Sequence, residues 1–182
     1  MLRPVAVVVA AILMSRPDLP REDATRWAEV LREEARERDF DPLTVVSLVH
    51  HESGWHPTRI SRSGEDFGLG QIRARYLEPC RKDEDPVRRP SEACKRLQEA
   101  LLEPEANLRT IARLVLLHRG ICRRKAGSAA AERWLASYQG RNYPRQKRWC
   151  VPGERTRQIL EYRAKLIREA PRAAARAAGE DR

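Results

Sequence analysis

The chain has 182 residues and a formal net charge of +10; 41% of its residues are apolar and 34% are charged. This length suits one domain with a real core and leaves little room for two, and the composition is that of a globular protein with a charged surface. The positive charge favours a polyanionic partner, and nucleic acid, acidic lipid and an acidic cell-wall polymer all fit it. A basic surface that only aids solubility fits it equally well.

Residues 1–20 have the pattern of an export signal or a membrane anchor. One early cation, Arg3, precedes an apolar run from Val5 to Met14, which has the length of the apolar part of a signal peptide. A membrane-spanning helix needs about 20 apolar residues, so this run is too short to cross a bilayer comfortably. No clear cleavage site follows the run, and the alternative is a buried N-terminal helix.

The next predicted elements are two helices and a loop. In residues 22–38 and 43–52 apolar side chains recur at helical spacing. Asp41 before Pro42 supplies a capping residue and a proline at the first helical position of the second helix. Glycine and serine then dominate residues 53–72, which predicts a loop with little regular structure, of the kind that carries function on a rigid scaffold.

The remainder of the chain is also predicted to be helical, apart from a small irregular or β-like excursion in residues 61–69. Further helices are expected at residues 72–77, 92–102, from 104 onward, at 129–138 and at 156–168. The segment 171–182 has little apolar surface to bury, and we expect it to be mobile. The predicted fold class is therefore mainly α.

Four widely spaced cysteines support export to an oxidising compartment. They form no C-x-x-C pair, so a zinc site is disfavoured. An even number behind a signal-like segment favours two disulfides. Of the three possible connectivities we favour Cys80–Cys94 and Cys122–Cys150, which close the smallest loops; four free buried thiols are the alternative.

Glu52 stands at the end of an apolar helical stripe. Positions three, four and seven residues before it lie on the same side of the helix, and these are Val49, Leu48 and Val45. A carboxyl group there is partly removed from water, which raises its pKa. A glutamic acid that keeps its proton can deliver it to a leaving group. The alternative is a terminal glutamate that turns out into water.

A zinc site at the same place is excluded by spacing. His51-Glu52 begins like the H-E-x-x-H motif, but the next histidine is His56, five residues after His51 instead of four. Gly54 and Pro57 also interrupt the helix that would align the two ligands. We therefore expect no metal and no other cofactor.

The residues around Glu52 resemble the signature of the soluble lytic transglycosylases, which belong to the lysozyme-like superfamily. That pattern is roughly E-S-G-[FW]-[ND]-P, a serine and a glycine, then G-L-M-Q-[IV]; this chain has ESGWHP at residues 52–57, Ser61, Gly64, and GLGQI at residues 68–72. Further on, PEANL at 104–108 and ASYQG at 136–140 are similar to the family's P-E-x-N-[IL] and A-Y-N-x-G segments.

The resemblance implies a single lysozyme-like helical domain over residues 21–170, with a substrate groove and an irregular loop after the catalytic helix. It also implies cleavage of the β-1,4 bond between N-acetylmuramic acid and N-acetylglucosamine in the glycan strands of peptidoglycan. Glu52 matches the family's single catalytic glutamate. It would protonate the glycosidic oxygen and then activate the muramoyl 6-hydroxyl to close a 1,6-anhydro ring, without a second carboxylate.

Other site residues follow from the same match. Ser53 is expected to contact Glu52 or the substrate, and Gln71 to hydrogen-bond the sugar in the groove. Tyr138 is expected near the catalytic carboxyl group. From its position just past the helix, Trp55 is expected to offer an apolar wall and a face for sugar stacking. The alternatives are structural roles: Ser53 would end the helix, and Tyr138 would pack in the core.

Three departures from the family pattern keep other functions open. Gly70 replaces a methionine and Gln139 an asparagine, which would suit a wall-binding module without turnover. Glu65-Asp66 stand where relatives have small residues; an acid there could position water and favour hydrolysis, as in goose-type lysozymes. A nucleic-acid binder is supported by charge alone, with no recognition motif. The expected location is the periplasm or cell envelope of a bacterium, and the sequence leaves the oligomeric state open.

Overall fold

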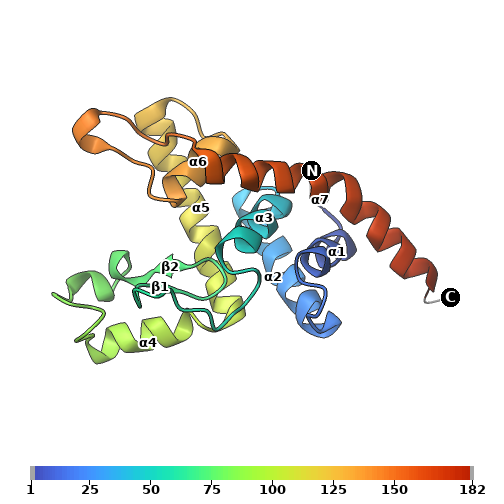
Figure 1. The fold of residues 1–182 in the computed structure, drawn as a ribbon, viewed down its shortest axis with the longest axis horizontal. Helices are drawn as coiled ribbons and strands as arrows, with labels where there is room; N and C mark the ends of the chain where they lie inside the picture. Colours follow the sequence, from blue (N-terminus) through green and yellow to red (C-terminus); the bar gives the residue numbers. More distant parts are fainter. Residues whose placement is uncertain (1–2, 181–182) are drawn as a thin grey trace.

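The computed structural model describes residues 3–180, and these form a mainly helical protein with one two-stranded sheet (Figure 1). The α-helices are α1 (Val5–Ser15), α2 (Arg21–Arg38), α3 (Pro42–Glu52), α4 (Glu92–Ala100), α5 (Pro104–Ala126), α6 (Ala131–Tyr138) and α7 (Glu154–Glu180). The strands are β1 (Asp66–Phe67) and β2 (Ile72–Arg73), and three 3-10 turns are η1 (Ala74–Tyr76), η2 (Cys80–Lys82) and η3 (Pro144–Gln146).

Helix α3 lies at the centre and is buried over most of its length. Every residue from Pro42 to Val49 is buried, because α1, α2 and α7 all contact this helix. The Asp41 side chain caps it by accepting a hydrogen bond from the backbone N–H of Leu43 at 3.2 Å. The apolar stripe that was expected before Glu52 is therefore confirmed as core, and it fixes the direction in which the end of α3 points.

Helix α1 is part of the folded domain. Its buried residues are Val7, Val8, Val9, Ala11 and Ile12, and it packs on α2, α3 and α7. At its C-terminal end the Arg16 guanidinium donates to the backbone oxygen of Trp55 at 2.7 Å. The segment 1–20, which was expected to be a signal or an anchor, thus contains a helix that packs on the bundle in this structure, and its role in export stays a prediction.

Two lobes extend from this central bundle, joined by the long helix α5 (Figure 1). One lobe holds the β1–β2 hairpin, η1, η2 and α4; the other holds α6, η3 and the start of α7. In the hairpin Asp66 pairs with Arg73 and Phe67 with Ile72. A helix had been predicted over residues 72–77; instead these residues form a strand followed by a 3-10 turn, because the pairing with β1 overrides local propensity.

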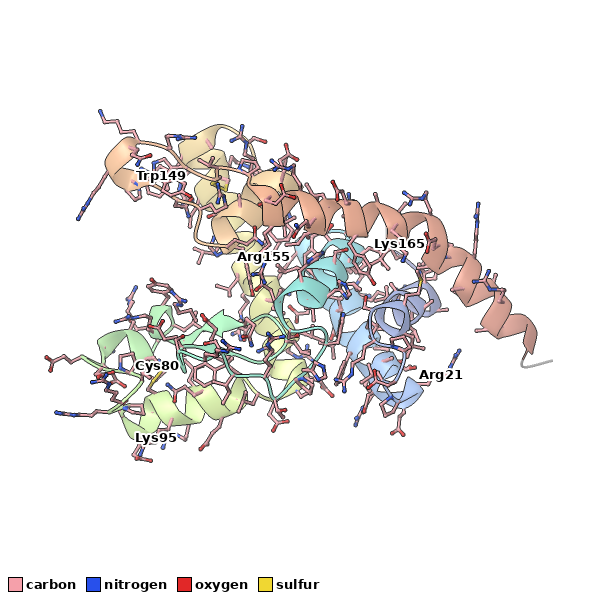
Figure 2. The ribbon with its side chains drawn as sticks, viewed as in Figure 1. Arg21, Cys80, Lys95, Trp149, Arg155 and Lys165 are labelled. Carbon is pink, nitrogen blue, oxygen red and sulfur yellow. A yellow bond between two sulfur atoms is a disulfide. The ribbon has the colours of Figure 1, made fainter. Side chains whose placement is uncertain are left out.

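Each lobe carries one disulfide, and both predicted pairings are confirmed. Cys80–Cys94 ties η2 to α4, and Cys122–Cys150 ties the C-terminal part of α5 to the segment before α7. No cysteine among residues 3–180 is free. Figure 2 shows Cys80 within the hairpin lobe. Two disulfides are compatible with an exported protein in an oxidising compartment.

Helix α7 is longer than the sequence predicted. It continues through Pro171 to Glu180, so residues 171–180 are helical here, and the mobility expected of residues 171–182 stays a prediction. Ala170 is fully buried and Ala174 packs against the core, which explains why the helix does not end at the proline. Within residues 3–180 we find no helix with the length and apolar character needed to traverse a bilayer.

Candidate functional site

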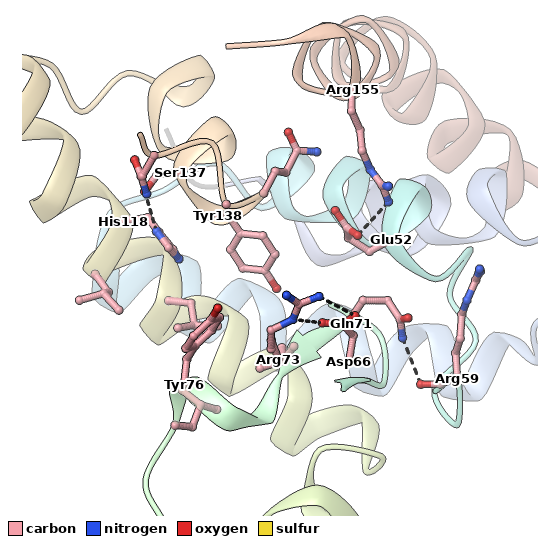
Figure 3. Close-up of a pocket in the computed structure, with 17 residues that line it drawn as sticks. Glu52, Arg59, Asp66, Gln71, Arg73, Tyr76, His118, Ser137, Tyr138 and Arg155 are labelled. Atoms are coloured by element: carbon pink, nitrogen blue, oxygen red, sulfur yellow. Dashed lines mark hydrogen bonds and ion pairs between the residues drawn. The ribbon is translucent and has the colours of Figure 1, made fainter. Parts of the chain in front are cut away.

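A groove of about 860 Å³ lies between the two lobes and reaches the end of α3 (Figure 3). Its walls come from α3, the loop after it, the hairpin, α5, α6 and the start of α7. The polar lining consists of Glu52, Arg59, Asp66, Gln71, Arg73, His118, Ser137, Gln139, Asn142 and Arg155, with Tyr76 and Tyr138 as its aromatic residues. The end of a buried helix thus opens into a charged cleft.

Glu52 is the last residue of α3, and its carboxyl group faces this groove. The side chain is only 13% exposed. Burial raises the pKa of Glu52, and the charge of Asp66 raises it further, whereas Arg155, Gln139 and Arg59 act in the opposite direction. The net direction is upward, which favours the protonated form that a general acid needs.

Arg155 holds the Glu52 carboxylate in this structure. Its Nη2 donates to Glu52 Oε2 at 2.8 Å and to the backbone oxygen of His51 at 2.8 Å. Arg155 reaches the site from the first turn of α7 and is 52% exposed. Sequence reasoning missed this residue, because no local pattern distinguishes it from the many other arginines of the C-terminal half.

A second carboxylate lines the groove on the hairpin side. Asp66 accepts two hydrogen bonds from the Arg73 guanidinium, at 2.9 and 3.3 Å. The pair forms because the two residues are direct partners across the β1–β2 hairpin. The neighbouring Glu65 pairs with Arg75 at 3.1 Å and is not among the groove residues. Of the two acids noted in the sequence, only Asp66 therefore lines the groove.

Tyr138 lies between the two lobes, where its hydroxyl donates to the backbone oxygen of Gly70 at 2.9 Å. Burial, together with the charges of Glu52 and Asp66, raises the pKa of Tyr138 well above its ordinary value. The phenol therefore stays neutral and polar beside the carboxyl groups. The expectation that Tyr138 lies near Glu52 agrees with this arrangement (Figure 3).

Glycine at position 70 is explained by packing. A Cβ atom on Gly70 would lie 2.6 Å from a side-chain carbon of Ile111 and 2.7 Å from the Tyr138 hydroxyl oxygen. The loop is pressed against α5 here, and its backbone N–H donates to Asn107 Oδ1 at 2.9 Å. Glycine in place of methionine thus lets the backbone at residue 70 approach Ile111 and Tyr138 closely, and Tyr138 lines the groove.

Asn107 clamps this loop from the start of α5. The side chain is fully buried, and its Nδ2 donates to the backbone oxygens of Phe67 at 3.1 Å and Leu101 at 2.6 Å. The PEANL segment was noted in the sequence only as a family-like pattern. Its asparagine now has a physical role, which is to satisfy buried backbone groups of the loop that carries Gln71.

Gln71 lines the groove, and its expected hydrogen bond to a sugar stays a prediction. Its Nε2 donates to the backbone oxygens of Gly68 at 3.0 Å and Arg59 at 3.1 Å. These two bonds fix the amide, so the group that Gln71 can offer to a ligand is its carbonyl oxygen. Backbone strain marks the same place, because Gln71 has a φ of 45°, a conformation that is uncommon outside glycine and clusters at functional sites.

Two of the predicted substrate contacts are corrected by the structure. The Trp55 side chain is fully buried and stacks on Trp27, with ring centroids 5.9 Å apart, so its ring is not available to a sugar. Ser53 is also fully buried, and its Oγ accepts from the backbone N–H of Trp55 at 3.1 Å. Both residues shape the turn after α3 without lining the groove, because that turn packs inward on α2.

His118, which α5 contributes, is also a groove residue. Its Nδ1 lies 2.9 Å from Ser137 Oγ, which also accepts from the Asn142 amide at 2.9 Å. Burial lowers the pKa of His118 to about 4. The imidazole is therefore neutral at ordinary pH and serves as a polar wall beside Tyr138, not as a cation.

No metal-binding group of three histidine, cysteine, aspartate or glutamate side chains occurs within residues 3–180. Comparisons of the chain with protein-family models, with curated proteins and with solved structures give no match.

Proposed function

We propose that this protein is a peptidoglycan lytic transglycosylase with a lysozyme-like fold, which cleaves the β-1,4 bond between N-acetylmuramic acid and N-acetylglucosamine. The observation that carries the proposal is the position of Glu52. It is a 13% exposed carboxyl group with a raised pKa at the end of a buried helix, in a groove that Gln71 and Tyr138 also line. The resemblance of residues 52–72 to the family signature adds independent support.

Glu52 acts first as a general acid and then as a general base. In its protonated form it gives its proton to the glycosidic oxygen, and the resulting carboxylate removes the proton of the muramoyl 6-hydroxyl as this oxygen closes the 1,6-anhydro ring. The neutral Tyr138 hydroxyl and the carbonyl oxygen of Gln71 supply polar contacts to the sugar. Because the sugar's own hydroxyl is the nucleophile, no carboxylate nucleophile is required.

Arg155 sets the condition under which the first step runs. The guanidinium favours the ionised form of Glu52. It therefore disfavours the protonated acid that the first step needs, and it stabilises the carboxylate that remains after the proton has been transferred. Arg155 is half-exposed and attached to the first turn of α7, so it is able to move away when a glycan enters. Because Arg155 affects both protonation states of Glu52, its replacement should change the pH dependence of the reaction.

A hydrolytic, goose-type-lysozyme-like reaction is the second candidate, and Asp66 is the observation that favours it. This carboxylate faces the groove on the side opposite Glu52 (Figure 3), where it could orient a water molecule. Both of its carboxylate oxygens already accept hydrogen bonds from the Arg73 guanidinium, which is why we place ring closure first. If the protein binds peptidoglycan but does not cleave it, a non-catalytic wall-binding module becomes the better proposal.

The test is digestion of purified peptidoglycan sacculi followed by mass spectrometry of the soluble products. We expect 1,6-anhydromuramic acid ends from the wild type. In Glu52→Gln the rate should fall by about 10²–10⁴-fold, which is the usual contribution of a general acid–base group. Glu65→Gln is the control, since Glu65 is an acid of the same loop that does not itself line the groove; it pairs with Arg75 at 3.1 Å and more distantly with Arg73 at 3.7 Å. Products with reducing ends would indicate attack by water. Binding to sacculi without release of soluble products would refute the proposed enzymatic activity.

A periplasmic or cell-envelope location follows from this proposal, because the substrate is the cell wall. The two disulfides and the basic composition support it. A net positive protein is held near anionic wall polymers, and this attraction weakens as salt is added.

A further inference from the structure

Most of the positive charge of the chain is concentrated in one segment. Residues 119–153 contain nine lysine and arginine residues and a single acid, Glu132, so this segment carries +8 of the chain's net charge of +10. It comprises the C-terminal end of α5, helix α6 and the η3 loop. Six of its cations are exposed, and we call these six the η3 patch: Arg123, Arg124, Lys125, Arg145, Lys147 and Arg148.

The two halves of the η3 patch come from different parts of the chain and are joined covalently. The Cys122–Cys150 disulfide, whose Cα atoms are 5.8 Å apart, connects the start of the run 123–125 to the end of the run 145–148. The Lys125 ammonium also lies over the Trp149 ring, 5.5 Å from its centroid. The two runs of cations therefore form one surface, in the lobe where Figure 2 labels Trp149.

The backbone of the η3 loop is held in place before any partner binds. The N–H of Tyr143 donates to the backbone oxygen of Arg148 at 2.7 Å, and the N–H of Arg148 donates back to the oxygen of Tyr143 at 3.2 Å. The N–H of Cys150 donates to Asn142 Oδ1 at 2.9 Å. Because the loop is already ordered, little backbone entropy is lost when the cations on it bind a partner.

None of the six cations has an acidic partner within residues 3–180. The ion pairs of this part of the chain all involve other arginine and lysine side chains. The single acid of the segment, Glu132, pairs with none of them. Like charges gathered in this way repel one another and destabilise the folded state. An anionic partner would remove that repulsion, so the η3 patch has the charge of a binding surface.

The groove does not use the η3 patch. None of the six cations lines the groove, although Gly140 and Asn142 of the same lobe do. A single-stranded polyanion follows a positively charged groove, and the groove found here excludes these cations. Trp149 lies half-buried beside them, whereas the other three tryptophans are buried. Exposed cations around a tryptophan favour the headgroup layer of an anionic bilayer, where the indole lies among the headgroups and the cations meet the phosphates.

We propose that the η3 patch docks this protein on a membrane surface that contains anionic phospholipids. The lipid phosphates pair with the six cations, and the Trp149 ring enters the headgroup layer. This inference goes beyond the proposed function and does not depend on it, because the contact is with lipid and lies outside the groove. Combined with the proposed function, it keeps the groove close to the membrane that borders the cell wall.

Co-sedimentation of the full chain with phospholipid vesicles tests the proposal. We expect binding to vesicles that contain phosphatidylglycerol, no binding to pure phosphatidylcholine vesicles, and a loss of affinity as salt is added. Each basic residue near an anionic surface contributes about fivefold to the affinity. Removal of three cations should therefore lower the affinity by about a hundredfold. The patch variant combines three substitutions of exposed arginines: Arg123→Gln, Arg145→Gln and Arg148→Gln.

A second triple variant on α7 is the matched control. It also replaces three exposed arginines that form no ion pair within residues 3–180, so the change in net charge is the same: Arg168→Gln, Arg172→Gln and Arg176→Gln. We expect this control to bind nearly as well as the wild type. Equal losses in the two triple variants would show that net charge alone is responsible, and would refute the η3 patch. Binding to duplex DNA without binding to the anionic vesicles would overturn the membrane assignment and make nucleic acid the partner.

Tryptophan fluorescence reports directly on the docked surface. Because Trp27, Trp55 and Trp134 are buried, a change in emission on addition of anionic vesicles should come from Trp149. We expect a shift to shorter wavelength in the wild type and none in Trp149→Phe; an equal shift in that variant would place the contact elsewhere and refute the proposal. The vesicles contain no glycan, so a failure of membrane docking leaves the release of muropeptides from sacculi as a separate result.

Discussion

Arg155 and Glu52 lie 103 residues apart in sequence, and a hydrogen bond of 2.8 Å joins their side chains. Helix α7 contacts α3 along its path, and this packing brings the first turn of α7 over the end of α3 (Figure 2). The proton-donating group proposed here is therefore opposed by a cation that only the tertiary fold supplies. This pair makes the pH dependence of activity a sensitive readout of the site.

Replacement of Arg155 by glutamine should move the activity profile toward higher pH. Arg155 lowers the pKa of Glu52, so its removal raises that pKa, and the protonated acid then persists to a higher pH. The basic limb of the pH–rate profile on sacculi should shift upward, with Arg155→Lys between the two. Arg157→Gln is the control, because Arg157 pairs with Glu154 on the surface of the same helix turn. An unchanged basic limb in Arg155→Gln would show that the pair does not control the acid.

Gly70→Ala should destabilise the protein and impair the site. The added Cβ would meet Ile111 and the Tyr138 hydroxyl at under 3 Å, and overpacking of this kind lowers the free energy of unfolding by about 1–3 kcal/mol. Urea unfolding measures this change, and glycan binding by the same variant reports on the displaced Tyr138. Gly179→Ala is the control, since a Cβ there meets nothing within 4 Å. Equal stability of the two variants would contradict the close approach at residue 70.

The buried imidazole of His118 predicts a loss of stability in acid. Its pKa is about 4 in the folded protein against the ordinary 6.5. The unfolded chain therefore binds this proton more readily, and the free energy of unfolding decreases as pH falls from about 6.5 toward 4. Unfolding midpoints at several pH values should show a shallower decrease for His118→Gln than for the wild type. Identical slopes for His118→Gln and the wild type would refute the assignment.

Removal of residues 1–16 should abolish folding. Helix α1 contributes five buried apolar side chains, and each buried valine or isoleucine is worth about 1.5–3 kcal/mol, against a total stability of about 5–15 kcal/mol for a typical domain. Circular dichroism and thermal melting of the shortened chain test this directly. Removal of residues 175–182 from the end of α7 is the control, and it should leave the melting transition nearly unchanged. A cooperative melt after the N-terminal deletion would show that α1 is dispensable, as an export signal would be.

Local sequence determined most of the helical framework and the part of the site that lies within one loop. The helical periodicity of residues 22–38 and 43–52 marked the inward faces of α2 and α3, and Asp41-Pro42 marked where α3 begins. The position of Glu52 after Val45, Leu48 and Val49 indicated a partly buried carboxyl group, but it left open the alternative that the side chain turns out into water. The spacing of the cysteines gave the correct pairing, because sequential closure kept each disulfide within one lobe.

Tertiary structure decided which of the loop residues face the groove and which distant residues join them. Trp55 turned inward because Trp27 of α2 offers it a stacking partner, and nothing within residues 52–57 encodes that contact. Arg155, Asn107 and Tyr76 joined the site through the packing of α7, α5 and the hairpin. Periodicity records whether a side chain is buried, whereas the partner that buries it depends on contacts between segments far apart in the chain, and those exist only once the chain has folded.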